Sequence, residues 1–317
     1  MELPWAMPLM QAPVGPAGTP ELVAAVSGAG AVGTLAASWT DPSVLRGQIQ
    51  RIAAATDRPY CVNLVLAFDQ RERLRVVIKE AVPLVSFSWG VDDAMIRLAR
   101  DSGMTVLIQV GNIEDAIRAD AAGADLLIAQ GLEAGGHVQS TTPLEPLIRA
   151  VRRVVRRPIV AAGGIADADG ARRAIGAGAD AIACGTAFLA ASEADVHPHY
   201  LDRLIRADPD DTVVTELFDG GWPDAPHRVL RNSTVARWEA EGRPGPGARP
   251  GEGDVVAHRN GQPVARYDDT QPTRSTSGDI EAMAMYAGQS VVGITRREPA
   301  AAIVQRIAGS LRHGHSR

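Results

Sequence analysis

The chain has 317 residues, of which 45% are hydrophobic and only 4% aromatic. It carries 32 Lys and Arg against 37 Asp and Glu, a formal net charge of −5. We therefore expect no basic face for a nucleic-acid backbone. Two cysteines, Cys61 and Cys184, are no disulfide framework and favour a reducing compartment. The length suits one α/β barrel of about 250 residues with additions.

Other function classes are excluded by what the sequence lacks. No run approaches the roughly 18–20 uninterrupted apolar residues of a membrane span. The first ten residues lack a basic region and contain two prolines, so we expect no signal peptide and a cytoplasmic protein. The only lysine, Lys79, follows Ile78 rather than Gly, which excludes a P-loop ATPase and argues against Schiff-base chemistry. Metal signatures such as HExxH and paired CxxC are absent, and we predict no metal.

Up to residue 190, short apolar runs alternate with helical patterns. The helical segments open with Asp, Glu, Pro or Thr and most close on Gly, as helix ends do. The apolar runs are continuous rather than alternating, which is typical of parallel strands covered on both faces. The expected strands are Pro8–Val14, Ala31–Ala36, Tyr60–Leu66, Pro83–Phe87, Thr105–Val110, Asp125–Ala129, Pro158–Ala162 and Ala181–Cys184.

Eight strand–helix units in order predict a (β/α)8 TIM barrel, with a doubly wound open sheet as the alternative. A weak repeat supports repeated units, since AAGADLLIAQG at 121–131 resembles GAGADAIACGT at 176–186. The sequence Gly28-Ala29-Gly30-Ala31-Val32-Gly33 matches the dinucleotide fingerprint in letters only. It follows an expected helix and leads into an expected strand, the reverse of that motif, so we interpret it as a helix end and a tight turn.

The character of the chain changes near residue 236. Residues 236–279 are dense in Pro, Gly and charge, and we expect an extended excursion without a core of its own. Helical patterns return in IEAMAMYAGQSVVG and EPAAAIVQRIAGSLR, which we expect to pack back on the barrel. The predicted organisation is therefore a barrel of residues 1–235 with 280–308, interrupted by the insertion 236–279.

The segment DLLIAQGLEAGGHVQ at 125–139 is the most informative for function. Its strand ends near Gln130, and the loop beyond it contains Gly135, Gly136 and His137. In a barrel this loop lies at the carboxyl ends of the strands, where active sites form. Paired glycines let a backbone approach a ligand closely, and His137 is then a candidate base. The alternative is a solvent-exposed loop histidine.

Two further strand ends suit a phosphate. Gly163 and Gly164 follow the seventh strand, and Gly185 and Thr186 follow the eighth. The loops after these strands form the recurrent phosphate site of barrels, through backbone N–H groups and a helix start. Either loop alone could be an ordinary turn, whereas the two together predict phosphate binding.

Three amide side chains, Asn63, Gln109 and Gln130, stand at expected strand ends. Buried amides need partners, so they either bond a heterocycle or satisfy the backbone of a neighbouring loop. We interpret His197 and His199 as a surface loop rather than a metal pair, assign no role to His227, and regard Cys184 as a small core residue.

Four segments together resemble the nitronate monooxygenases, the 2-nitropropane dioxygenase-like flavoproteins. They are QAPVGPAGTPELVAAVSGAGAVG, AQGLEAGGH, IVAAGGIADADGARRAIGAGADAIACGTAF and YAGQS. The likeness covers roughly residues 5–235 and 280–305. The segment QG-x-EAGGH is similar also to the flavin-dependent enoyl-ACP reductases. The Pro/Gly-rich stretch 239–279 has no counterpart in compact members of the family.

The resemblance implies an FMN-binding barrel without a metal, in which His137 matches the catalytic histidine. It implies FMN contacts at Gln11, Ala12, Pro13, Asn63, Gln109, Gln130, Gly135, Gly136, Gly163, Gly164, Gly185, Thr186 and Gln289. The implied activity is oxidation of alkyl nitronates, and of nitroalkanes, by O₂ to a carbonyl compound and nitrite. An FMN-dependent NAD(P)H reductase of enoyl-ACP or quinone type is the alternative, and a non-catalytic phosphate-binding barrel is the second. A homodimer is compatible with the sequence.

Overall fold

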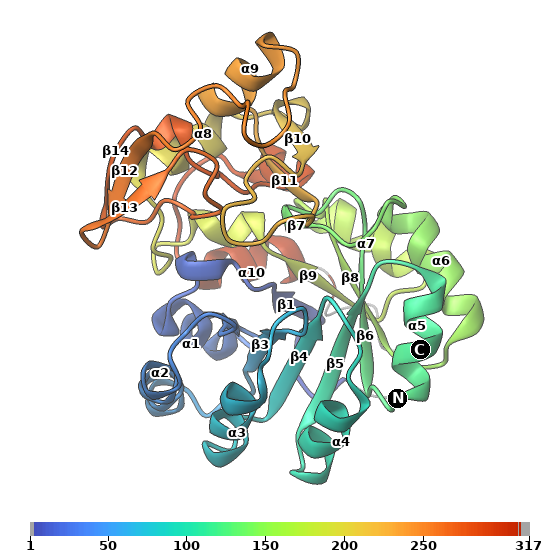
Figure 1. Ribbon diagram of the computed structural model, residues 1–317. Coiled ribbons are helices and arrows are strands. Elements are labelled where there is room, and N and C mark those ends of the chain that lie inside the picture. The colour runs from blue at the N-terminus through green and yellow to red at the C-terminus, as the bar shows by residue number, and fades with distance from the viewer. Residues whose placement is uncertain (1–2, 310, 312–317) are drawn as a thin grey trace.

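The structure is a computed structural model that describes residues 3–309 and 311, and its centre is a parallel barrel (Figure 1). The sheet order is β1-β9-β8-β6-β5-β4-β3-β2, and every pairing within it is parallel. Backbone bonds of Leu9 and Gln11 to Val32 join the two edges. The strands are β1 (Leu9–Gln11), β2 (Thr34–Ala36), β3 (Cys61–Val65), β4 (Leu84–Ser88), β5 (Thr105–Val110), β6 (Leu126–Gln130), β8 (Ile159–Ala162) and β9 (Ala181–Cys184).

The predicted (β/α)8 barrel is confirmed, with all eight strands in the expected order. Most barrel-strand residues are buried, since side chains fill the barrel and helices cover its outside. Helix starts follow the expected chemistry: Thr19, Asp41 and Asn112 each cap a helix through the side-chain oxygen. The helices around the barrel are α1 (Pro20–Gly28), α2 (Pro42–Ala55), α3 (Arg71–Lys79), α4 (Asp93–Asp101), α5 (Ile113–Ala121), α6 (Leu144–Val154), α7 (Ala168–Ala177) and α10 (Ala300–Ala308).

A second layer lies over the carboxyl ends of the barrel strands, above the barrel in Figure 1. It contains two small antiparallel sheets, with orders β10-β11-β7 and β13-β12-β14. Its elements are β7 (Gly136–His137), α8 (Pro198–Arg206), β10 (Thr212–Thr215), β11 (His227–Leu230), α9 (Ser233–Ala240), β12 (Val255–Arg259), β13 (Gln262–Ala265) and β14 (Thr276–Gly278). Short 3-10 turns complete the chain: η1 (Gly15–Ala17), η2 (Thr186–Ala190), η3 (Pro209–Asp211), η4 (Ile280–Ala282) and η5 (Gln289–Gly293).

The insertion 236–279 packs against apolar residues that lie outside it. Tyr267 packs with Phe218 and Val229 in one cluster, and Val264 packs with Met283 in another. One expectation for the C-terminal third is wrong. The segment IEAMAMYAGQSVVG forms two 3-10 turns rather than a helix, whereas the expected helix after it is present as α10.

The interpretation of the glycine-rich segment 28–33 is confirmed. Gly28 ends α1, Gly30 adopts a φ of +92°, and Gly33 leads into β2. A Cβ on Gly33 would overlap the carbonyl oxygen of Val23, whereas a Cβ on Gly28 would meet nothing within 4 Å. The glycines therefore serve the packing of α1 on β2.

This difference predicts opposite effects for two substitutions in one motif. Gly33→Ala should lower the free energy of unfolding by about 1–3 kcal/mol or more, because the backbone of α1 cannot move aside cheaply. Gly28→Ala should leave it unchanged or raise it by up to about 1 kcal/mol, because Ala favours the helix. Urea unfolding of both variants checks this, and an equal loss in both would contradict the packing argument.

Candidate functional site

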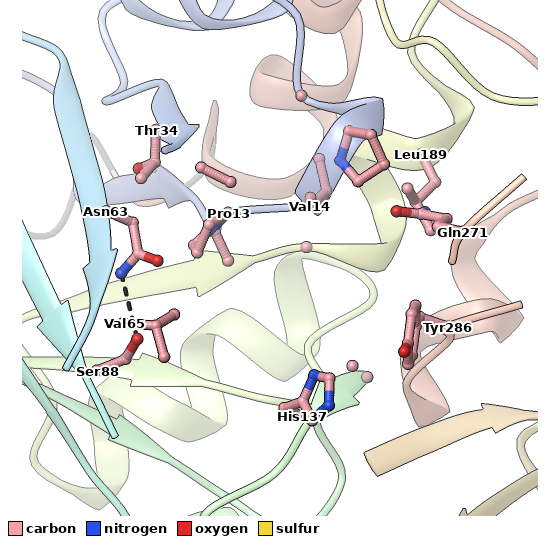
Figure 2. Close-up of a pocket in the computed structure, with 18 of the residues that line it drawn as sticks. Pro13, Val14, Thr34, Asn63, Val65, Ser88, His137, Leu189, Gln271 and Tyr286 are labelled. Carbon is pink, nitrogen blue, oxygen red and sulfur yellow. Dashed lines mark hydrogen bonds between the residues drawn. The ribbon is translucent and has the colours of Figure 1, made fainter. Parts of the chain in front are cut away.

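One cavity of about 1020 Å³ opens at the carboxyl ends of the barrel strands. Its lining comes from the barrel-strand ends and from the covering layer, including the segment 269–275. Figure 2 shows Asn63 and Ser88 at one side, with His137 and Tyr286 toward the other. The volume is at the upper end of the roughly 300–1,000 Å³ typical of small-molecule sites.

His137 lies in this cavity on strand β7, which pairs antiparallel with β11 so that His137 faces His227. Its ring stacks on Trp222, with centroids 4.3 Å apart and planes at 28°. Its Nε2 is buried and has no hydrogen-bond partner within the described residues. Burial, and then the neighbouring His227, lower the pKa of His137 to about 3. The imidazole is therefore neutral near pH 7, and its Nε2 has no partner among the described residues.

The loop before His137 is held by side chains of its own motif. Gln130 donates from Nε2 to the carbonyl of His137 at 3.0 Å and accepts from the N–H of Gln139 at 2.9 Å. The Glu133 carboxylate accepts the N–H of Leu144 and so caps the start of α6. Gln130 and Glu133 therefore fix the backbone that carries His137.

The C-terminal segment closes against the same loop. A Cβ on Gly135 would overlap the backbone N of Gly288, so the two glycines allow the strands of backbone to touch. The N–H of Gln289 donates to the carbonyl of Glu133 at 3.0 Å, and the N–H of Gly288 donates to the Thr186 hydroxyl at 3.0 Å. Residues 286–290 thus join the histidine loop to the loop after β9.

The predicted phosphate loops both line the cavity. Gly163 and Gly164 have φ of +117° and +69°, the left-handed region that favours glycine. Among the residues described, no hydrogen bond uses the backbone N–H of Gly164, Gly185 or Thr186. Three free donors from two adjacent loops suit the oxygens of a phosphate.

The structure brings most predicted site residues together. Gln11 and Gln289 are not part of the cavity wall; the Gln11 side chain is fully buried and accepts the N–H of Thr34 at 2.9 Å. Gln109 donates to the Gln139 side chain at 2.7 Å. The predicted residues that line the cavity are Ala12, Pro13, Asn63, Gln109, Gln130, Gly135, Gly136, His137, Gly163, Gly164, Gly185 and Thr186.

Sequence reasoning missed His227, which it gave no role. This residue is fully buried; its Nδ1 bonds the Ala225 carbonyl at 2.9 Å and its Nε2 accepts the Phe218 N–H at 3.3 Å. Both ring nitrogens are thereby used, and burial lowers the pKa of His227. It is a neutral support beside His137. No local pattern identifies it, because its position opposite His137 is set by pairing between distant strands.

The remaining expectations concern residues to which the sequence gave no catalytic role. His197 caps α8 and His199 pairs with Glu281. In the described part of the chain, no three His, Cys, Asp or Glu residues are grouped to hold a metal. Burial raises the pKa of Cys184 to about 12, so its thiol is no nucleophile near pH 7. None of the described helices has the length and apolar character to cross a membrane.

Comparison with known proteins identifies the family. The chain matches the nitronate monooxygenase family over residues 3–73 and 67–309, and it belongs to that family of oxidoreductases. FabK from Thermotoga maritima has a similar structure, with a TM-score of 0.79 and 32% identity over 95% of this chain and 91% of FabK. A nitroalkane oxidase from Streptomyces ansochromogenes has a TM-score of 0.75 and 30% identity over 95% of this chain and 94% of that one.

A curated relative from Mycobacterium tuberculosis is described as (3aS,4S,5R,7aS)-5-hydroxy-7a-methyl-1-oxo-octahydro-1H-indene-4-carboxyl-CoA dehydrogenase. It is 34% identical over 239 residues, which cover 74% of this chain. The match spans 66% of that relative's length, just under two thirds. Likeness to this chain therefore extends to proteins described by different activities.

The buried histidine predicts acid sensitivity. Unfolded His137 has a pKa near 6.5 and the folded residue a pKa of about 3, so the unfolded chain binds more protons between these values. The free energy of unfolding should therefore fall as the pH drops from 6.5 toward 3, by up to about 1.4 kcal/mol per pH unit from this residue. Urea unfolding of His137→Phe at pH 7 and pH 5 should show a smaller pH effect.

The matched control is His258→Phe, which changes an exposed histidine of β12. It should keep the pH effect of the unsubstituted protein. An unchanged slope in His137→Phe would contradict burial of a neutral ring.

Proposed function

We propose that the protein is an FMN-dependent nitronate monooxygenase that oxidises alkyl nitronates, and nitroalkanes, with O₂. The C–N bond of the nitronate breaks, one oxygen atom of O₂ enters the resulting carbonyl and nitrite leaves, so that in the balanced reaction two nitronates consume one O₂. The observation that carries the proposal is the unpartnered, neutral His137 in a cavity whose other lining includes three free backbone N–H groups. Membership of the nitronate monooxygenase family supports it.

The residues present fit FMN. The free N–H groups of Gly164, Gly185 and Thr186 would hold its phosphate without a cationic side chain. A Cβ on Gly136 would meet nothing within 4 Å, so this backbone leaves open space beside His137. Ala12 and Pro13 would lie against the ring system, and Asn63 offers an amide at its polar edge. When bound, FMN supplies electron transfer from the substrate to O₂.

The protein's own side chains would take up the substrate's proton and hold the imidazole in position. Neutral His137 would take the proton from the carbon of a nitroalkane, and an anion bound beside it would raise its pKa and stabilise the charged ring. Stacking on Trp222 fixes the plane of the imidazole. A nitronate has already lost that proton, so for this substrate form His137 would act by hydrogen bonding.

A second candidate is an FMN-dependent NAD(P)H reductase of enoyl-ACP or quinone type. The cavity favours it in one respect, because it continues past the barrel mouth to Trp39, Gln48 and Arg259, more room than a small nitronate needs. The description of the mycobacterial relative as a CoA dehydrogenase agrees with a large substrate. A non-catalytic phosphate-binding barrel is the third candidate.

Two buried free cysteines support a cytoplasmic location.

The proposal is tested by mixing FMN-loaded protein with propionate 3-nitronate without oxygen and following the flavin absorbance. We expect the nitronate to bleach the flavin band and NADH to leave it unchanged. Bleaching by NADH alone would support the reductase instead. Absence of any flavin band after FMN has been added would contradict both.

His137→Ala separates the two substrate forms. We expect kcat/KM for a neutral nitroalkane to fall by about 10²–10⁴-fold, the usual contribution of a positioned general base. The loss for the corresponding nitronate should be much smaller, because no C–H proton remains to be removed. Steady-state oxygen consumption with both forms measures this, and equal turnover of wild type and variant on both would remove His137 from the mechanism.

A further inference from the structure

Four of the 13 Trp, Tyr and Phe residues of this chain gather at one side of the cavity. Trp39, Phe68, Trp89 and Trp222 form a contiguous group, here called the aromatic wall. Ring centroids lie 4.8 Å apart for Trp89 and Trp222, 5.3 Å for Phe68 and Trp222, and 5.6 Å for Trp39 and Phe68. Trp39, Trp89 and Trp222 line the cavity, and Trp39 is 58% exposed. An exposed aromatic edge on a cavity is typical of a ligand contact.

Trp89 is held in an unfavourable backbone conformation. It follows β4 with a φ of +58°, a region that costs free energy for a bulky residue and that Gly or Asn adopts more easily. Its N–H donates to the Gln139 side chain at 3.3 Å, which also accepts from Gln109. Strain of this kind gathers at functional sites, and here it places an indole ring on the cavity wall.

A carboxylate without an ion pair lies next to the aromatic wall. Asp269 lines the cavity and forms no ion pair among the described residues; burial and the neighbouring Asp268 raise its pKa more than the charge of Arg259 lowers it. A Cβ on Gly221 would be 2.6 Å from each carboxylate oxygen, so Asp269 packs against the residue before Trp222. The Tyr286 hydroxyl donates to the main-chain carbonyl of Asp269 at 3.0 Å. Asp269 is thus fixed between Trp222 and Tyr286, and both of these rings contact His137.

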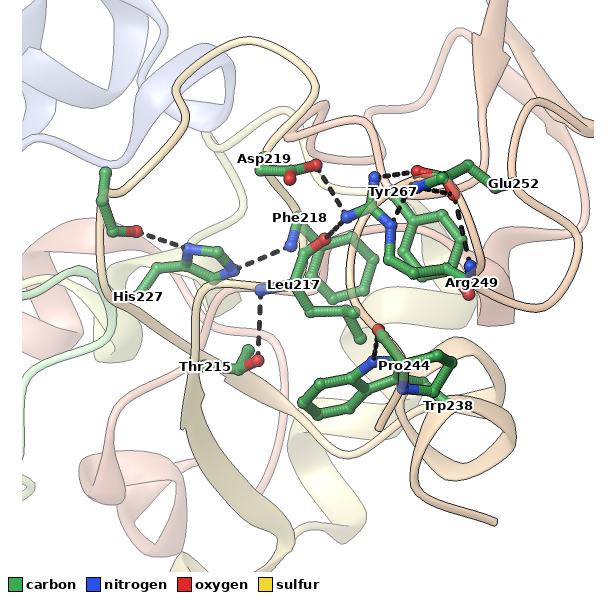
Figure 3. A network of polar contacts seen from close by, with 12 residues as sticks. Thr215, Leu217, Phe218, Asp219, His227, Trp238, Pro244, Arg249, Glu252 and Tyr267 are labelled. Atoms are coloured by element: carbon green, nitrogen blue, oxygen red, sulfur yellow. Dashed lines mark hydrogen bonds and ion pairs between the residues drawn. The ribbon is translucent and has the colours of Figure 1, made fainter. Parts of the chain in front are cut away.

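Figure 3 shows a polar network around Arg249, which joins the insertion to the segment before Trp222. Arg249 donates to the Leu217 carbonyl at 3.2 Å and to the Asp219 carboxylate at 2.9 Å, and its guanidinium lies 4.4 Å from the Tyr267 ring centroid. It therefore ties the insertion 236–279 to the start of the loop that carries Trp222. The insertion contributes Asp269 and Arg259 to the lining of the cavity.

From this geometry we infer that the cavity selects a ring-containing ammonium compound, with the ring on the aromatic wall and the ammonium at Asp269. Aromatic rings pack favourably edge to face on one another, and a half-buried carboxylate is stabilised by a positive or hydrogen-bond-donating partner. The other charged side chains of the lining are Asp41, Asp195 and Arg259. Asp41 accepts from Ser43 at the start of α2 and Asp195 accepts the N–H of Arg274, so Asp269 is the lining carboxylate available to a cationic group of the ligand.

The inference deepens the proposed function, on which it rests only for the reaction that the bound compound undergoes. Binding itself is measurable without turnover. Calorimetric titration of FMN-loaded protein with 2-phenylethylamine, 2-phenylethanol and 3-phenylpropionate compares one ring with three end groups. We expect the amine to bind at least tenfold more tightly than the alcohol, and the carboxylate to bind most weakly. Equal or tighter binding of the carboxylate would overturn the inference.

Asp269→Asn should bring the affinity for the amine to within about twofold of that for the alcohol. The matched control is Asp268→Asn, the adjacent carboxylate, which is outside the cavity lining and accepts the N–H of Ala265. It makes the same change of charge and should keep the preference for the amine. An undiminished preference in Asp269→Asn, or an equal loss in both variants, would overturn the role of Asp269.

Trp89→Gly tests the wall separately, since glycine accepts the backbone conformation at this position. We expect weaker binding of the amine and the alcohol alike, with a melting temperature close to that of the unsubstituted protein. Unchanged binding of both ligands would overturn the role of Trp89. If the protein prefers the amine but oxidises no nitronate, the proposed function fails while this inference stands. If it oxidises nitronate but shows no preference for the amine, this inference alone fails.

Discussion

The site depends on one short antiparallel pairing, that of β7 with β11. Two residues of the loop after β6, Gly136 and His137, pair with Arg228 and His227. This pairing turns an exposed loop into part of a sheet and joins the barrel to the layer above it. It buries His137 between Trp222 and His227, and that burial makes the imidazole neutral.

Three regions of the cavity lining differ in polarity, although few charged side chains line it. At the phosphate loops, free backbone N–H groups provide positive potential without a cation. At His137 the environment is aromatic and neutral, and near Asp269 it is negative. A ligand that spans these regions would be oriented by its own charge distribution, because each region favours a different group.

The insertion after residue 236 contributes to the site rather than decorating the barrel. Tyr267 of the insertion packs against Phe218 and Val229, which lie outside it and so anchor it to the covering layer. Arg249 ties it to the loop of Trp222, and Asp269 reaches the cavity from its far end. This insertion lines the cavity with Asp269 and Arg259, and it would therefore help to set the choice of substrate in the proposed function. The proposed reaction centre at His137 and the proposed specificity residue Asp269 come from separate segments.

The sequence by itself determined the barrel, the strand order and the loops of the site. Continuous apolar runs, helix caps and glycines are local signals, and the carboxyl ends of parallel strands must share one face. For that reason His137, Gly164 and Thr186 could be assigned to one cavity in advance. The amide of Gln11 could not be placed, since the side of a strand on which a residue points depends on register at the edge of the barrel.

Only the tertiary structure decided three features: the position of His227, the packing of the insertion against the covering layer, and the gathering of four aromatic rings at the cavity. Each depends on contacts between segments far apart in the chain, such as β7 with β11 and Asp269 with Gly221. Such contacts leave no periodic trace in either segment. Burial, and with it the pKa of His137, is a property of those contacts and not of the residue type.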